Sequence, residues 1–372
     1  MLMAYQTRLQ SLRKIMSDHR VPLVAANAGS SLTYLTGLSF HVSERPAILF
    51  VPLDGLPCFF FPEFEREKVN RAGMDLCAFP YPEDPGQWPA IMNRLINSIA
   101  SENKSIAVLP EEFRYLEMRL IQQVVPEITF SSAAEIFQSL LVIKDDQEQA
   151  AIRKAVSIAE KAFRQTFPAI RAGRTETEIA NQLVIHLLEQ GSSPELPFSP
   201  IVASGPNSAD PHAMPGGRVF QPGDLIVIDW GACWDGYTSD ITRTVCLGAP
   251  SHQAAAITEL VAAANQAGRS QAGPGAPACD VDAAARSVIA AGGFGENFIH
   301  RAGHGIGLKA HEEPYISPVE TKPLAAGMVF TVEPGIYLPG WGGIRIEDNV
   351  LITPSGADTL TTLPRELWIA PA

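Results

Sequence analysis

Two aspartates that flank a short turn give the first chemical signal in this chain of 372 residues. Asp229 closes the apolar run 225–230, and Asp240 follows in the strand-like run 237–244, with Asp235-Gly236 as the turn. A loop centred before Asp235 places Asp229 opposite Asp240, with Cβ atoms roughly 4.5–5.5 Å apart. Carboxylates that close repel each other unless a cation lies between them. The spacing therefore indicates a metal site. Two structural aspartates, one paired with Arg243, are the alternative.

A second acidic pair and a histidine share this pattern. Glu333 ends the apolar run 328–332, and Glu347 lies within the alternating strand 344–351. A loop centred on Gly340 places Glu333 opposite Glu347. His304 lies in the glycine string 303–307, where glycines allow close backbone packing around an imidazole. A phosphate loop is disfavoured, because the Lys-Ser/Thr of a P-loop and the Rossmann spacing are both missing.

The combined set of four carboxylates and one imidazole predicts a centre with two metal ions. Two divalent cations would balance four carboxylate charges, and two-metal sites hold their ions about 3.5–4 Å apart. A ligand set of carboxylate oxygens with one imidazole suits Mn²⁺, Co²⁺ or Fe²⁺ better than it suits a metal that prefers sulfur ligands. We expect Mn²⁺, with Co²⁺, Zn²⁺ or Fe²⁺ as alternatives. Each acid taken alone could instead be a structural carboxylate.

The elements that must position these residues form an α+β protein with two domains. Helix and strand signals alternate up to about residue 140, which predicts a small N-terminal α/β domain. A long helical stripe follows over 145–170, and strand signals dominate beyond residue 191, with helices near 252–268 and 280–291. We place the domains at 1–142 and 143–372, with all the candidate ligands in the second.

Composition excludes several classes of function. The chain is 46% hydrophobic and 18% charged, which is typical of a soluble globular protein. Its formal net charge of −12 argues against nucleic acid or an anionic membrane as the main partner. We read no signal peptide and no transmembrane span. The five cysteines lack any CxxC pairing, so we expect free thiols and a cytoplasmic protein.

Several separated motifs resemble the pita-bread metallopeptidases, and among them the Xaa-Pro branch of prolidase and aminopeptidase P. The resemblance covers essentially the whole chain, more loosely in the first domain. The strings that carry it are Asp-Gly-Tyr-x-Ser-Asp-Ile-Thr-Arg-Thr (235–244), His-Arg-x-Gly-His-Gly-Ile-Gly (300–307), His-Glu-Glu-Pro (311–314), Glu-Pro-Gly-Ile-Tyr (333–337), Gly-Ile-Arg-Ile-Glu-Asp (343–348) and Ala-Ser-Gly-Pro-Asn-Ser with Pro-His-Ala (203–213).

The resemblance implies a role for each metal ligand. Asp229 would chelate one metal, His304 with Glu333 would hold the other, and Asp240 and Glu347 would bridge the two. Glu333 would also handle the proton of the attacking water. The implied fold is a creatinase/prolidase N-terminal domain followed by a curved antiparallel sheet backed by helices, and the implied assembly is a homodimer.

The resemblance also implies residues for the substrate side. His212 and His311 would stabilise the tetrahedral intermediate or the leaving nitrogen. His300 would be a substrate-side or supporting group, and Arg345 would pair with a substrate carboxylate.

The implied activity is hydrolysis of the Xaa-Pro bond in dipeptides or short peptides, with the dipeptidase favoured. Aminopeptidase P acting on longer peptides is the first alternative, because an arginine in the same string does not separate the two. A metal-dependent small-molecule hydrolase or lyase on this fold is the second. Creatinase-like relatives lack metal ligands that are all present here. A non-catalytic binding protein is the third alternative, and such relatives usually lose ligands.

Overall fold

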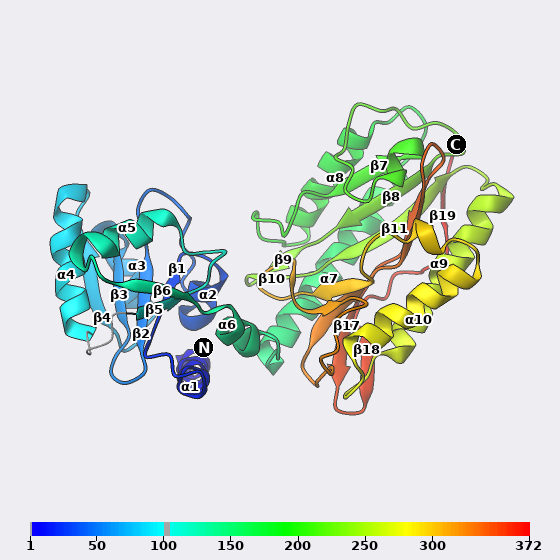
Figure 1. The fold of residues 1–372 in the computed structure, drawn as a ribbon. Helices are drawn as coiled ribbons and strands as arrows, with labels where there is room; N and C mark the ends of the chain where they lie inside the picture. The colour runs from blue at the N-terminus through cyan, green and yellow to red at the C-terminus, as the bar shows by residue number, and fades with distance from the viewer. Residues whose placement is uncertain (1, 100–104) are drawn as a thin grey trace. The chain divides into compact units, whose positions relative to one another are not determined.

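The structure is a computed structural model that describes residues 2–99 and 105–372. The chain divides into two compact units, Met1–Leu141 and Val142–Ala372, which Figure 1 colours from blue to red along the sequence. Within the described ranges, no helix is both long and apolar enough to cross a membrane.

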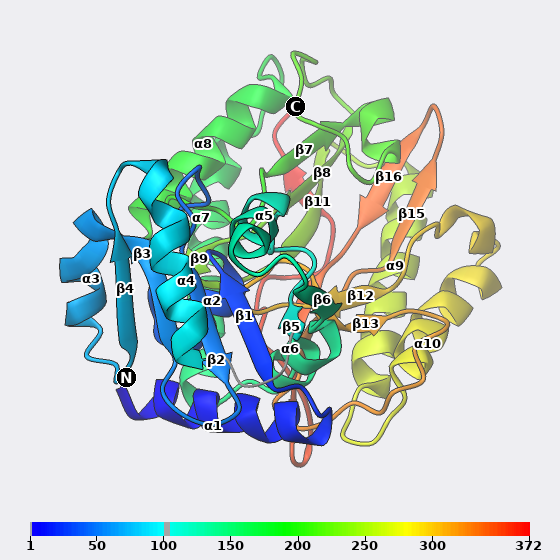
Figure 2. The ribbon, with the colours of Figure 1, turned by 60° about the vertical axis from the view of Figure 1, so that its left-hand side comes forward.

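The first unit is a mixed sheet with helices on its faces. The strand order is β4-β3-β2-β1-β5-β6, with β2 antiparallel to both neighbours and the other pairs parallel. Figure 2 shows α4 crossing the strands of this sheet. The elements are α1 (Leu2–Asp18), β1 (Leu23–Asn27), α2 (Ser30–Thr36), β2 (Ile48–Pro52), β3 (Cys58–Pro62), η1 (Glu63–Glu65), α3 (Arg66–Arg71), β4 (Cys77–Tyr81), η2 (Pro85–Gln87), α4 (Trp88–Ile99), β5 (Ser105–Val108), α5 (Tyr115–Val124), β6 (Thr129–Ser132) and α6 (Ala134–Leu141).

Apolar side chains alternate across these strands, which explains the layered packing. Ile48 and Phe50 of β2 and Phe60 of β3 pack with α4 and α5 in one core cluster. Leu12 and Met16 of α1 are fully buried, as their helical spacing predicts.

The second unit holds all of the candidate ligands. Its larger sheets have the orders β19-β11-β8-β7 and β13-β12-β14-β17-β18, and the hairpins β9–β10 and β15–β16 complete it. The elements are α7 (Asp146–Thr166), η3 (Phe167–Ala169), α8 (Glu176–Glu189), β7 (Ile201–Ser204), η4 (Gly205–Ala209), β8 (Leu225–Trp230), β9 (Cys233–Trp234), β10 (Tyr237–Thr238), β11 (Ile241–Leu247), α9 (His252–Gln271), α10 (Ala278–Ala291), η5 (Gly295–Asn297), β12 (Gly303–Gly305), β13 (Glu312–Ile316), β14 (Val329–Val332), β15 (Gly335–Leu338), β16 (Gly342–Arg345), β17 (Asp348–Thr353), β18 (Gly356–Thr359) and β19 (Trp368–Ala370).

Each of the two larger sheets is backed by a helix pair. The first core cluster joins α7 and α8 to β8 and β11, with Phe163 stacked on Trp230 at 4.6 Å between ring centroids. The second joins α9 and α10 to β14, β16 and β17. The capping boxes at Asp145 and Thr175 fix where α7 and α8 begin, because each side chain accepts hydrogen bonds from the first turn. These helices leave the opposite strand faces and strand ends for polar residues.

The expected turn centre of the first hairpin is wrong by one residue, which shifts the partner of Asp229 by two residues. The turn is centred on Asp235-Gly236, both with positive φ, so Trp234 pairs with Tyr237. Asp229 therefore lies opposite Thr242, and Asp240 falls in the break between β10 and β11. The long second strand expected over 237–244 is interrupted there.

The second hairpin keeps the expected register but not the expected continuity. Gly335 pairs with Arg345 in one ladder and Val332 with Asp348 in the next. Glu347 lies in the gap between β16 and β17 rather than inside one strand. Glu347 thus lies where the chain leaves one sheet and enters another, and its side chain is buried there.

Candidate active site

Strand ends place the five predicted metal ligands around one point. Asp229 lies near the end of β8, Asp240 just before β11, His304 in β12, Glu333 just after β14 and Glu347 just before β17. All five residues line the same cavity.

Three overlapping groups of side chains have ligand atoms within 4.8 Å of one another. These groups are Asp240 with His304 and His311, His304 with Glu333 and Glu347, and Asp229 with Asp240 and Glu347. The Nε2 atom of His304 lies 3.6 Å from Asp240 Oδ2 and 3.4 Å from Glu333 Oε1. The structure therefore brings all five predicted ligands together, and His311 joins them.

Close backbone approach explains the glycines beside His304. A Cβ at Gly303 would lie 1.9 Å from the carbonyl oxygen of Thr331, and one at Gly305 would lie 2.1 Å from that of Glu313. Nδ1 of His304 lies 3.2 Å from the carbonyl oxygen of Gly305, which favours the proton on that nitrogen. This tautomer leaves the Nε2 lone pair directed at the carboxylates, as a metal ligand requires.

Burial and mutual repulsion raise the pKa values of three of the carboxyl groups. Burial first, then Glu347 and Asp229, raise the pKa of Asp240, and burial, Glu333 and Asp229 raise that of Glu347. Burial raises the pKa of Glu333 to about 7, although Arg345 opposes the shift. Burial and the neighbouring His311 lower the pKa of His304. The cluster thus disfavours its own ionised carboxylates unless a cation is added.

Two of the carboxylate oxygens have lone pairs that accept no hydrogen bond from the described residues and could bind a cation. Within the described part of the chain, buried Oδ1 atoms of Asp229 and Asp240 have no hydrogen-bond partner. Buried carboxylate oxygens are normally satisfied, so these two fit ligand positions. The donor set of carboxylates with imidazole fits hard or borderline divalent metals.

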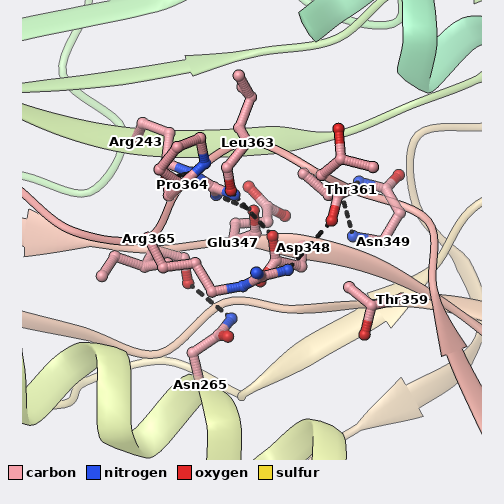
Figure 3. A network of polar contacts seen from close by, with 12 residues as sticks. Arg243, Asn265, Glu347, Asp348, Asn349, Thr359, Thr361, Leu363, Pro364 and Arg365 are labelled. Atoms are coloured by element: carbon pink, nitrogen blue, oxygen red, sulfur yellow. Dashed lines mark hydrogen bonds and ion pairs between the residues drawn. The ribbon is translucent and has the colours of Figure 1, made fainter. Parts of the chain in front are cut away.

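A network around Asp348 fixes the backbone that carries Glu347 (Figure 3). Arg243 is fully buried, and its Nη1 donates to the carbonyl oxygen of Glu347 at 2.6 Å and to that of Thr242 at 2.8 Å. Its Nη2 donates to Asp348 Oδ1 at 2.8 Å, and Arg365 Nε donates to Oδ2 at 2.7 Å. The hydroxyl of Thr242 donates to Glu347 Oε2 at 2.7 Å. Arg243 therefore joins the backbone of Glu347 to that of Thr242, the residue that pairs with Asp229 between β8 and β11.

Arg345 is held by protein groups rather than left free for substrate. Nη2 donates to Asp229 Oδ2 at 2.7 Å, Nη1 to the hydroxyl of Tyr337 at 2.8 Å, and Nε to Thr242 Oγ1 at 3.1 Å. Only 2% of its surface is exposed. These contacts favour a role in orienting Asp229 and weigh against the expected pairing with a substrate carboxylate.

His300 is similarly engaged. Its Nε2 lies 2.9 Å from the Tyr337 hydroxyl, and its Nδ1 lies 2.8 Å from the carbonyl oxygen of Arg301. Burial, followed by the charge of Arg345, lowers the pKa of His300 to about 4. The neutral ring therefore accepts from Tyr337 and supports the Tyr337–Arg345 contact, instead of offering a free nitrogen to substrate.

A buried glutamate pins the loop that carries His212. Glu176 accepts from the backbone N–H of Ser204 at 2.8 Å and of Gly216 at 3.0 Å, and from the side chain of Asn207 at 3.1 Å. Both ends of the loop are thus tied to one carboxylate. His212 is exposed on this loop and faces the cavity of the site. Sequence reasoning missed Glu176, which lies in a capping box far from the motif.

A buried ion pair supports His311 in the same way. Lys144 Nζ pairs with Glu312 Oε1, the residue after His311, and the Lys144 side chain is 1% exposed. Glu312 pairs in register with Gly305, next to His304. The rings of His304 and His311 meet edge to face with centroids 4.0 Å apart. The pair therefore fixes the turn that carries both imidazoles.

A cavity of about 680 Å³, a size that suits a short peptide, is lined by the five predicted ligands together with His212, His300, His311 and Arg345. Its lining combines the acidic cluster with an apolar wall of Pro197, Phe198, Ile201 and Met214. Arg301 also lines the cavity, and sequence reasoning missed it although it lies in the His-Arg-x-Gly-His string.

Comparison with known proteins identifies the class. Residues 150–354 match the model of metallopeptidase family M24, and residues 8–141 match the creatinase/prolidase N-terminal domain. The chain belongs to metallopeptidase family M24. The expected fold class, an N-terminal α/β domain followed by a pita-bread domain, is confirmed.

The chain is similar to individual proline-specific peptidases within this family. The chain is 33% identical to the Xaa-Pro dipeptidase of Lactobacillus helveticus over 98% of this chain and 99% of that protein. The crystal structure of a prolidase from Thermococcus sibiricus aligns with a TM-score of 0.92 at 33% identity, covering 98% of this chain and 99% of that one. An X-Pro aminopeptidase from Thermotoga maritima aligns with a TM-score of 0.85 at 31% identity, covering 97% and 99%.

Proposed function

We propose that this M24 metallopeptidase hydrolyses the Xaa-Pro bond of dipeptides, as a prolidase. One observation carries the proposal: four carboxylates, buried or partly buried, converge with His304 around a cavity that is also lined by Arg345 and Arg301. The sequence similarity to an Xaa-Pro dipeptidase over nearly the whole length supports it.

We assign two divalent cations to this cluster. The ligands would be Asp229, Asp240, His304, Glu333 and Glu347. Asp240 and Glu347 would be shared between the two cations, because each belongs both to the group with Asp229 and to a group with His304. When bound, the cations would polarise the scissile carbonyl and lower the pKa of water. The unpartnered oxygens of Asp229 and Asp240 support this assignment. Of the candidate metals, Mn²⁺ fits the oxygen-rich set best.

The chain's own residues would then orient the peptide and move protons. Glu333, which lies at the cavity with Oε1 3.4 Å from His304 Nε2, is suited to take a proton from water and pass it to the proline nitrogen. His311, beside His304, and His212 on the loop pinned by Glu176 would donate hydrogen bonds to the carbonyl oxygen. A proline nitrogen has no N–H, so recognition must come from these groups and from the apolar wall.

An aminopeptidase is the second candidate function, favoured by the aligned structure of an X-Pro aminopeptidase. The two activities differ in whether the residue after proline is tolerated. We further propose a cytoplasmic homodimer whose catalytic domain spans 143–372. The five free cysteines support the reducing compartment.

Chelation and reconstitution test the proposal. Protein treated with a chelator and reloaded with Mn²⁺ is assayed on Ala-Pro, Ala-Pro-Ala and Ala-Ala. We expect metal-dependent cleavage of Ala-Pro, weaker cleavage of Ala-Pro-Ala and none of Ala-Ala. Cleavage of Ala-Pro-Ala alone would establish the aminopeptidase instead. Failure to cleave either proline peptide with Mn²⁺, Co²⁺ or Zn²⁺ would overturn the Xaa-Pro assignment. Elution at the mass of one chain would reject the dimer.

A further inference from the structure

We propose that Arg301 is the anion-recognition residue of the cavity and binds a carboxylate of the substrate. This inference rests on the proposed function and adds which chemical group of the peptide is read. The relevant chemistry is a planar guanidinium facing a carboxylate, which forms two parallel charge-assisted hydrogen bonds.

Arg301 is the cationic group of the cavity that remains available. The structure gives its guanidinium neither an ion pair nor a hydrogen bond to any residue in 2–99 or 105–372, whereas Arg345 is bound by Asp229, Thr242 and Tyr337. The two arginines therefore differ in role. Arg345 is buried and offsets the charge of Asp229, whereas Arg301 is half-buried and lines the space where substrate must lie.

The position of Arg301 is defined even without a polar partner. Its guanidinium carbon lies 4.3 Å from the centroid of the Tyr315 ring, a cation–π contact that restrains the side chain. Its backbone carbonyl oxygen accepts from His300 at 2.8 Å. Arg301 therefore presents a preoriented donor set instead of a freely moving side chain, which reduces the entropy lost on binding.

Arg301 lies at the same cavity as the groups proposed to react. The lining includes Arg301 together with Glu333, His311 and His212. A guanidinium in this lining lies close to a peptide that occupies the cavity.

Two parts of a peptide could supply the carboxylate. One is the C-terminal carboxylate of a Xaa-Pro dipeptide, which would make Arg301 a determinant of dipeptidase activity. The other is the side chain of an aspartate or glutamate before proline. Peptide amides separate these sources, because Ala-Pro amide lacks both carboxylates and Asp-Pro amide keeps only the side-chain one.

The experiment compares Arg301→Gln and Arg301→Lys with wild type, all loaded with Mn²⁺. The matched control is Arg153→Gln, which removes an arginine from the exposed surface of α7, where it pairs with Asp358. Substrates are Ala-Pro, Ala-Pro amide, Asp-Pro amide and Asn-Pro amide. Where an amide is not cleaved, its inhibition constant against Ala-Pro replaces kcat/KM. Metal content and Tm of each variant confirm that the site and fold persist.

We expect Arg301→Gln to raise KM for Ala-Pro by roughly ten-fold or more, as loss of a charged hydrogen bond does, with kcat much less affected. The effect on Ala-Pro amide should stay below about two-fold if the terminal carboxylate is bound. Selective loss on Asp-Pro amide relative to Asn-Pro amide would assign the side-chain carboxylate instead. Arg301→Lys should retain part of the discrimination, and Arg153→Gln all of it.

Equal losses on all four substrates, or no loss on any, would overturn the role of Arg301. Those results require a wild-type enzyme that cleaves Ala-Pro. If the wild type cleaves no proline peptide, the proposed function itself fails, and the two failures are thereby distinguished.

Discussion

Glu347 and Asp348 are neighbours in sequence and are both fully buried, yet the protein treats their charges in opposite ways. Asp348 is surrounded by arginines. Arg243 and Arg365 each donate a hydrogen bond to it (Figure 3). Arg269 Nε lies 3.4 Å from Asp348 Oδ2. Glu347 accepts from the Thr242 hydroxyl and otherwise faces other carboxylates.

The contrast shows which charge the chain neutralises itself. A buried carboxylate without a partner costs several kcal/mol, so an uncompensated group is retained only where something else binds it. Around Asp348 the protein supplies its own cations and builds a rigid support. Around Glu347 it supplies carboxylates, whose mutual repulsion bound protons or external cations must offset.

The largest effect should follow removal of a shared ligand. Glu347→Ala leaves both metal positions a ligand short, so we expect activity on Ala-Pro to fall by roughly 10³-fold or more, equivalent to about 4 kcal/mol. Asp240→Ala should behave alike. Metal content by mass spectrometry and steady-state kinetics measure the two consequences. Full activity in either variant would contradict the contrast between the cation-binding cluster at Glu347 and the arginine-neutralised Asp348.

Asp348→Ala should instead reduce stability. It leaves three arginines without their buried partner, and breaking such a network costs about 3–5 kcal/mol. Urea unfolding of the Mn²⁺-loaded protein measures the free energy of unfolding. The folded fraction should retain its metal. An unchanged unfolding free energy with lost metal would mean that Asp348 belongs to the metal centre.

His212→Ala sharpens the comparison from outside both groups. His212 is exposed on its loop and belongs to none of the three ligand groups, so its removal should slow kcat by roughly 10²-fold, as loss of an oxyanion donor does. Metal content and Tm should match those of wild type. Release of metal from this variant would place His212 among the ligands.

The sequence predicted the five converging residues because the four acids end or lie within recognisable strand segments and His304 lies in a glycine string. It failed on the register of Asp229 and Asp240, because nothing in the local residues shows that the strand breaks at Asp240. It also could not separate Arg345 from Arg301. Both arginines lie in motif strings, and only tertiary contacts with Asp229 and Tyr337 show which guanidinium is occupied.

A separate effect concerns pH. In metal-free protein the pKa of Glu333 is raised from 4.5 to about 7, and those of Asp240 and Glu347 are also raised. Between these values the folded state binds more protons than the unfolded state, so stability should fall as pH rises from about 4.5 to 7, each pKa unit being ~1.4 kcal/mol. Added Mn²⁺ should reverse the trend, because it binds the ionised carboxylates. Calorimetric Tm across this range, with and without Mn²⁺, measures it. A Tm of metal-free protein that rises with pH would contradict the assignment.

Counting bound metal tests the central claim most directly. Metal-free protein is titrated with Mn²⁺ by isothermal calorimetry, and bound metal is counted by mass spectrometry after removal of excess. We predict two Mn²⁺ per chain in wild type and in Asp348→Asn, and fewer than two in Glu347→Ala. A wild-type protein that binds no Mn²⁺, Co²⁺ or Zn²⁺ would contradict the account.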